Sequence, residues 1–97
     1  MKTDLDERYL DAVEAAECAV GKKLENGRHR EDNLIRFFVS YYLRSEGFTL
    51  HDIGRKMGKD HTSILHHCRV MESMMSVPMA YRQELDAYEK FKQIVCD

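Results

Sequence analysis

Residues 49–67 have the sequence TLHDIGRKMGKDHTSILHH, which carries start and stop signals for two consecutive helices. Thr49 stands three residues before an acid, as in a capping box, and Gly58 stands where the first helix would end. Asp60 can cap a second helix, which we expect to run from His61 to Ser76. Two helices joined by a tight turn that contains glycine form a helix-turn-helix, whose second helix enters the major groove of DNA.

The first turn of the second helix carries three polar side chains that can hydrogen-bond to base edges, His61, Thr62 and Ser63. By composition alone they could equally be exposed first-turn residues, and Asp60 could be only an N-cap. An acid repels phosphates, so in a DNA interface it serves mainly as a specificity device. The DNA-reading and the purely structural interpretations therefore both stay open at this point.

Three short runs together resemble the signature of the C-terminal DNA-binding domain of the bacterial replication initiator DnaA. They are Ile53-Gly54, Asp60-His61-Thr62-Ser63-Ile64-Leu65-His66 and Cys68-Arg69. The family pattern is roughly Ile-Gly and then Arg-Asp-His-Thr-Thr-Val-Leu-His-Ala-Cys-Arg. This chain departs from it at Lys59, Ser63, Ile64 and His67. The resemblance covers about residues 24–76, roughly half of the chain.

The resemblance implies an all-α, Trp-repressor-like bundle of about five helices that binds double-stranded DNA at sites related to DnaA boxes. Arg28, in a basic loop, would read a narrow minor groove, while residues 60–63 would read the major groove. Phosphates would be held by Lys56, Lys59 and Arg69. Residue 63 is Ser instead of Thr and lacks the methyl group that can pack on thymine, so we expect weaker discrimination there.

The full predicted DNA-binding set is Arg28, Arg30, Arg36, Leu50, Lys56, Lys59, Asp60, His61, Thr62, Ser63, His66 and Arg69. Some of these residues have a structural alternative. Arg28 and Arg30 could be solvated, Arg36 could pair with an acid of the first helix, and His66 could be packed. With about five or six phosphates neutralised, log affinity would fall with log salt at a slope of about −5.

The rest of the chain has the apolar spacing of helices. We expect further helices over residues 4–20, 31–46 and 79–95, a basic loop over residues 21–30, and a break at Pro78. Residues 1–97 are expected to form one domain with three parts: an acidic helix (1–21), the basic loop and helix-turn-helix core (22–76), and a C-terminal helix (77–97).

The charge is distributed unevenly along the chain. The net charge is −2, yet residues 22–70 hold ten basic and six acidic residues together with all five histidines. Residues 1–21 hold two basic and six acidic residues. A basic centre between acidic ends is the electrostatic pattern expected of a modest DNA-binding face.

Other classes of site have little support in the sequence. His66 and His67 are adjacent and would point about 100° apart on a helix, and no histidine pair has the spacing of a helical zinc site. The glycines before Lys59 do not match a phosphate-binding loop, and no ATPase module fits in 97 residues, so we expect no nucleotide, cofactor or metal. No catalytic constellation is visible, which predicts that the chain is not an enzyme.

We expect a cytoplasmic, nucleoid-associated protein, because the N-terminus is acidic, no apolar run could span a membrane, and the three cysteines lack a disulfide or CxxC pattern. Two alternatives remain. One is a small transcriptional regulator of a phage or mobile element that dimerises through its first and last helices, with Met71, Met74, Met75 and Met79 between them. The other is a protein-interaction module that has lost DNA binding.

Overall fold

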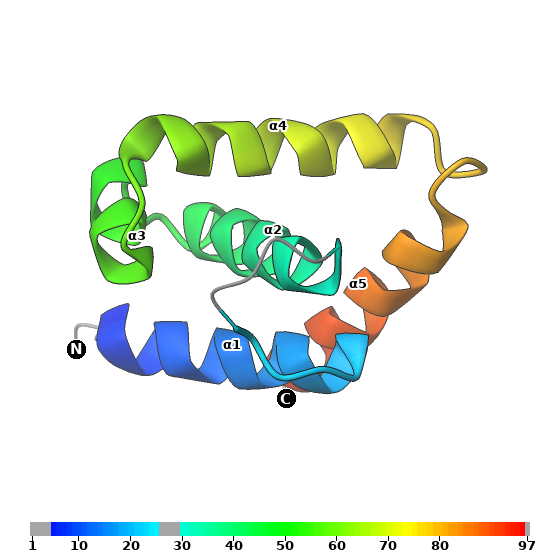
Figure 1. The fold of residues 1–97 in the computed structure, drawn as a ribbon, viewed down its shortest axis with the longest axis horizontal. Coiled ribbons are helices and arrows are strands. Elements are labelled where there is room, and N and C mark those ends of the chain that lie inside the picture. Colours follow the sequence, from blue (N-terminus) through cyan, green and yellow to red (C-terminus); the bar gives the residue numbers. More distant parts are fainter. Residues whose placement is uncertain (1–4, 26–29, 97) are drawn as a thin grey trace.

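The computed structural model describes residues 5–25 and 30–96, and every regular element in them is a helix (Figure 1). The helices are α1 (Leu5–Val20), α2 (Arg30–Ser45), α3 (Leu50–Met57), α4 (His61–Ser76) and α5 (Arg82–Cys96). They pack as an all-α bundle, which confirms the fold class expected from the sequence.

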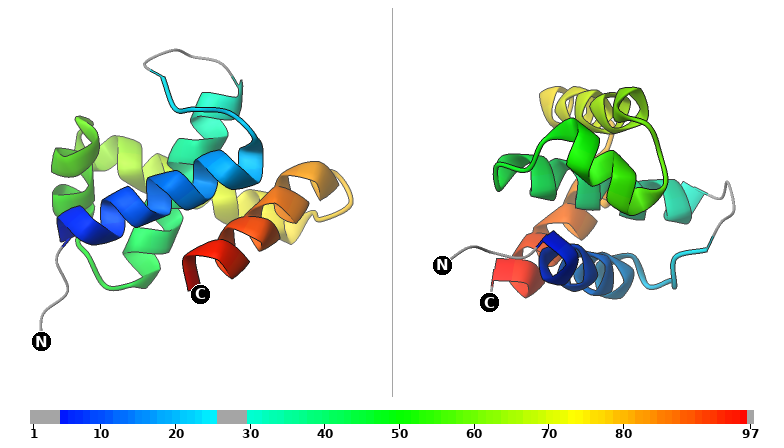
Figure 2. Two further views of the ribbon diagram at one scale, coloured as in Figure 1. Left: turned by 90° about the horizontal axis from the view of Figure 1, so that it is seen from below. Right: turned by 90° about the vertical axis from the view of Figure 1, so that its left-hand side faces the viewer.

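Helix α2 lies at the centre of the bundle, with α3 and α4 on one side and α1 and α5 on the other (Figures 1 and 2). Its Ile35, Phe38 and Leu43 side chains are wholly buried. The centroid of the Phe38 ring lies 5.3 Å from that of the Tyr88 ring and 5.7 Å from that of the Phe91 ring, and both of these residues are on α5. Aromatic pairs at such distances add stability beyond that of area burial, so this cluster anchors α5 to α2.

Local backbone chemistry fixes the α3–α4 connection. The Thr49 hydroxyl accepts from the Asp52 backbone N–H at 3.0 Å, which caps α3. Gly58 ends α3 in the left-handed conformation (φ 72°), where glycine has no steric penalty. Gly54 is buried because the turn packs against it: a Cβ there would lie 2.6 Å from the Lys59 carbonyl oxygen. These contacts hold α4 at a fixed angle to α3.

Two helix boundaries differ from those expected. Helix α2 begins at Arg30, so this residue belongs to the helix and not to the basic loop. Helix α5 begins at Arg82 instead of Met79. Residues 77–81 form a turn in which the Ala80 N–H donates to the Val77 carbonyl and the Tyr81 N–H to the Pro78 carbonyl. Pro78 cannot extend a helix from α4, and the chain needs this turn to redirect itself into α5.

Two of the four methionines named with the dimer alternative are covered within the chain. Met71 and Met74 are buried in the core, and Met75 is half-buried. Met79 alone of the four is largely exposed, at 83%. Because packing within the chain already covers Met71 and Met74, they cannot serve a partner unless the fold opens.

Of the cysteines, Cys18 is exposed and Cys68 is buried, and burial raises the pKa of the Cys68 thiol. No helix among the described residues is both long and apolar enough to cross a membrane.

Candidate nucleic-acid interface

Asp60 caps the helix that the sequence predicts to read DNA. Its Oδ1 accepts from the Ser63 backbone N–H at 3.0 Å, and its backbone has the extended conformation of an N-cap. This hydrogen bond is the main reason that the pKa of the Asp60 carboxyl lies below its ordinary value of 3.8. A carboxylate therefore stands charged and exposed at the N-terminus of α4.

The three predicted reading residues differ in accessibility. His61 and Thr62 are exposed, whereas Ser63 is half-buried and its backbone N–H is engaged by the cap. The His61 ring also stacks on that of His51 from α3, with centroids 4.2 Å apart and planes at 30°. His51 was missing from the predicted set, and only its place one residue after Leu50, in the first turn of α3, could have suggested it. Both helices thus contribute to one surface.

One face of α4 is covered and the other is open. The buried positions are Ile64, His67, Cys68, Met71 and Met74. The exposed positions Thr62, His66, Arg69 and Ser73 recur at helical spacing and form a polar stripe along α4. Arg69, and Lys59 just before the N-cap of α4, make no ion pair with any residue in the described part of the chain, so both can meet an anion.

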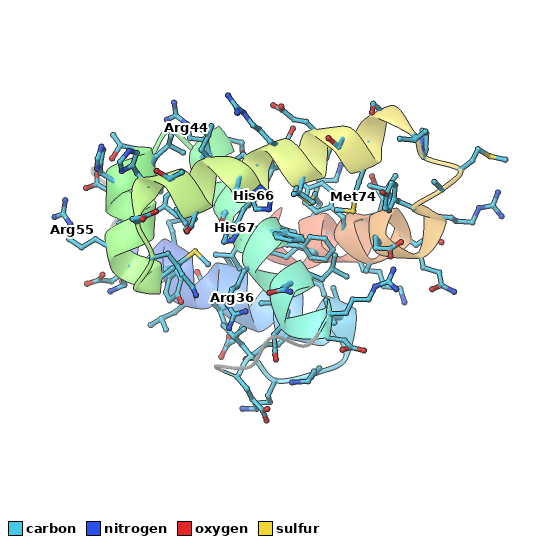
Figure 3. All side chains as sticks on the ribbon, turned by 45° about the horizontal axis from the view of Figure 1, so that its top comes forward. Arg36, Arg44, Arg55, His66, His67 and Met74 are labelled. Carbon is cyan, nitrogen blue, oxygen red and sulfur yellow. The ribbon has the colours of Figure 1, made fainter. Side chains whose placement is uncertain are left out.

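The arginine on α3 was also missed from the sequence. Arg55 has 78% of its side chain exposed and points away from the body of the protein (Figure 3). Its guanidinium lies 3.4 Å from the Asp52 carboxylate three residues earlier, a weak exposed contact. Leu50, a member of the predicted set, is half-buried and packs against the core.

Two cations of the predicted DNA-binding set form ion pairs with other helices. Lys56 forms an ion pair with Asp6 of α1, and its ammonium lies 6.0 Å from the centroid of the Tyr9 ring. Arg30 forms an ion pair with Glu84 of α5. Both cations therefore already have a carboxylate partner, although Arg30 keeps 77% of its side chain exposed.

Two side chains of α2 bind the first part of the basic loop, at Lys22 and Glu25. The Lys22 ammonium lies 3.0 Å from Oδ1 of the wholly buried Asp32, and the Glu25 backbone N–H donates to the same oxygen. Arg36 donates to the Glu25 carbonyl oxygen at 2.8 Å. Arg36 thus orders the loop, a role that neither of its sequence-based interpretations included. Arg28 lies outside the described residues.

His67, the largest departure from the family pattern, is buried under α4. Its Nδ1 lies 2.9 Å from the Ser40 hydroxyl oxygen, and its ring packs on Phe37 with centroids 5.2 Å apart. Figure 3 labels His67 beside His66. Burial, helped by the nearby positive charges of His66, Arg36 and Lys59, lowers the pKa of the imidazole to about 4. His67 is therefore a neutral core residue near neutral pH.

A groove of about 650 Å³ lies between α2, the C-terminal half of α4 and the start of α5. It is lined by Arg30, Asn33, Leu34, Phe37, His66, Arg69, Val70, Ser73, Met74, Tyr81 and Glu84. Within the ranges that the structure describes, no three His, Cys, Asp or Glu side chains come together as a metal site would require.

Comparison of the chain with models of known protein families, with curated proteins and with solved structures finds no match in any of the three.

Proposed function

We propose that the chain binds double-stranded DNA sequence-specifically, with α3 and α4 acting as a helix-turn-helix. The observation that carries this proposal is the capped and exposed first turn of α4, which the tight turn at residues 58–60 holds against α3. A recognition helix enters the major groove at its N-terminus, where its first residues meet base edges. Four of the residues that resemble the DnaA signature, Asp60 to Ser63, lie at that turn, which supports a target related to the DnaA box.

Each exposed residue of the turn has a chemical role in this proposal. His61 and Thr62 would hydrogen-bond to bases or phosphates, and the Thr62 methyl can pack on thymine. The Asp60 carboxylate keeps accepting capacity beyond its bond to the Ser63 N–H and would accept from a cytosine amino group. Ser63, being half-buried, would contribute chiefly through its place in the turn.

The electrostatic contribution is smaller than the sequence suggests. Lys56 and Arg30 already have carboxylate partners, and Arg36 is bound to the loop. Free or nearly free cations on the α3–α4 face are Lys59, Arg69 and Arg55. If the interface neutralises about three or four phosphates, log affinity falls with log salt at a slope of about −3 and not −5.

The test is binding of the purified protein to a labelled duplex that carries a DnaA-type box and to a scrambled duplex, each at low and moderate salt. Tighter binding to the box, lost in Thr62→Ala and kept in Ser76→Ala, supports site reading. Ser76 is the matched control because it is exposed at the other end of the same helix. Equal affinity for both duplexes overturns the sequence specificity, and a salt slope near zero overturns DNA binding itself.

A footprint of the bound duplex, added to this test, separates the two other functions considered from the sequence. A symmetric footprint on two half-sites would indicate a dimeric transcriptional regulator instead of a monomer at an asymmetric box. Absence of salt-sensitive DNA binding would favour a protein-interaction module.

A further inference from the structure

Helix α1 exposes an acidic stripe. Glu7, Asp11, Glu14 and Cys18 follow one another at spacings of four, three and four residues, which places them on one face of the helix, and all four are exposed. None of the three acids makes an ion pair within the described part of the chain. Leu10, beside this stripe, is 63% exposed. Leu10 is thus an exposed apolar side chain beside three carboxylates that make no ion pair in the described part of the chain.

The groove between α2, α4 and the start of α5 has an apolar lining and an arginine that makes no ion pair in the described part of the chain. Its apolar lining comes from Leu34, Phe37, Val70 and Met74, on α2 and α4. Its charged lining consists of Arg30, Arg69 and Glu84, and Glu84 is already paired with Arg30. The groove therefore presents an apolar floor whose rim holds the Arg30–Glu84 ion pair and one further cation, Arg69, which makes no ion pair within the described residues.

We propose that the groove binds the acidic stripe of a second copy of this chain, with Leu10 seated on the apolar floor. The acids that flank Leu10 would face Arg69 at the rim. A buried apolar anchor supplies affinity, while complementary charges orient the encounter and select the partner. A contact this small is weak, since stable interfaces bury far more surface.

The acidic stripe and the groove lie on different parts of the molecule. Helix α1, which carries the stripe, is on the opposite side of α2 from α4, which lines the groove (Figures 1 and 2). Such a contact is heterologous and head-to-tail, and it stays open unless the rotation between copies closes a ring. Mean mass should therefore rise steadily with concentration and show no plateau at a dimer. Along α4, Arg69 lies about 12 Å from His61. The contact between copies therefore need not cover the first turn of α4, which we propose to read DNA.

The experiment is sedimentation velocity of the intact protein, without DNA, from micromolar to millimolar concentration at low and high salt. Each of Leu10→Ser, Glu14→Lys and Arg69→Glu should weaken association at least about tenfold. Asp86→Lys and Arg55→Glu carry the same changes in charge at exposed positions outside the stripe and the groove, so they should associate as the unchanged chain does. Circular dichroism confirms that each variant is folded.

The decisive sample is an equal mixture of Glu14→Lys and Arg69→Glu. Neither variant associates well alone, but the lysine of one fits the altered groove of the other, and the remaining surfaces form the original contact. The mixture should therefore regain the association of the unchanged chain. The proposal is overturned if the unchanged chain stays monomeric throughout, if its mass levels off at a dimer, if the two single variants associate normally, or if their mixture does not associate.

Discussion

Acidification should destabilise the fold through His67. The imidazole is buried, borders the Ser40 hydroxyl and packs on Phe37, and these surroundings lower its pKa to about 4, against an ordinary value of 6.5. A folded state that resists protonation loses stability once the unfolded chain begins to take up the proton. The loss should therefore begin as the pH falls below about 6.5 and continue until the folded state is itself protonated, near pH 4.

The size of the effect follows from the gap between these two pKa values. Each pH unit of the gap is worth about 1.4 kcal/mol, so His67 can contribute up to about 3 kcal/mol of lost stability between neutral pH and pH 4. A domain of this size has a total stability of only about 5 to 10 kcal/mol, so the change is large enough to measure.

The assay is urea unfolding at several pH values between 7.5 and 4.5, followed by circular dichroism. His67→Gln is the matched variant, because its amide can still hydrogen-bond to Ser40 but does not titrate. Below about pH 6.5 the unchanged chain should lose stability more steeply than His67→Gln, although the variant starts from lower stability because its packing on Phe37 changes. Parallel pH profiles for the two proteins would refute the assignment of the acid sensitivity to His67.

Three further outcomes are expected. Gly54→Ala should destabilise the fold by about 1 to 3 kcal/mol in chemical unfolding, even though alanine favours helix, because its Cβ would meet the Lys59 carbonyl oxygen at 2.6 Å. If the proposed DNA contact is correct, Lys59→Ala should make the salt slope of DNA binding shallower by about 0.9, whereas Lys56→Ala should leave the slope unchanged and lower the melting temperature through its lost contact with α1. Asp32→Asn should speed hydrogen exchange at the Glu25 amide, because a neutral acceptor binds both that N–H and Lys22 more weakly.

The sequence predicted the α3–α4 connection well because its determinants are local. Thr49, Gly58 and Asp60 each act on backbone groups within three or four residues of themselves, so their roles are visible in a short window. The bounds of α4 were predicted as His61–Ser76 and are confirmed. The start of α5 was wrong because helical spacing continues through residues 79–81, and only the turn after Pro78 interrupts it.

Long-range partners could not be predicted from the sequence. Lys56 meets an acid fifty residues away, and a lysine close to a proposed recognition helix looks the same in a sequence whether it is free or paired. His51 and His61 stack across two helices, which requires the relative orientation of those helices to be known. His67 was considered only as a metal ligand and as a departure from the family pattern, because its burial depends on Phe37 and Ser40 of α2.

The pairing of Lys56 and Arg30 bears on how the proposed DNA binding would achieve specificity. Attraction to phosphates is the same for every sequence, so each cation removed from the interface lowers specific and non-specific affinity together. What remains is the discrimination supplied by the first turn of α4, where Asp60 adds repulsion of phosphates to its selection of a base. An interface with few free cations and a carboxylate at its centre would bind weakly but select strongly. The ratio of affinities for the box and the scrambled duplex should therefore vary less with salt than either affinity alone.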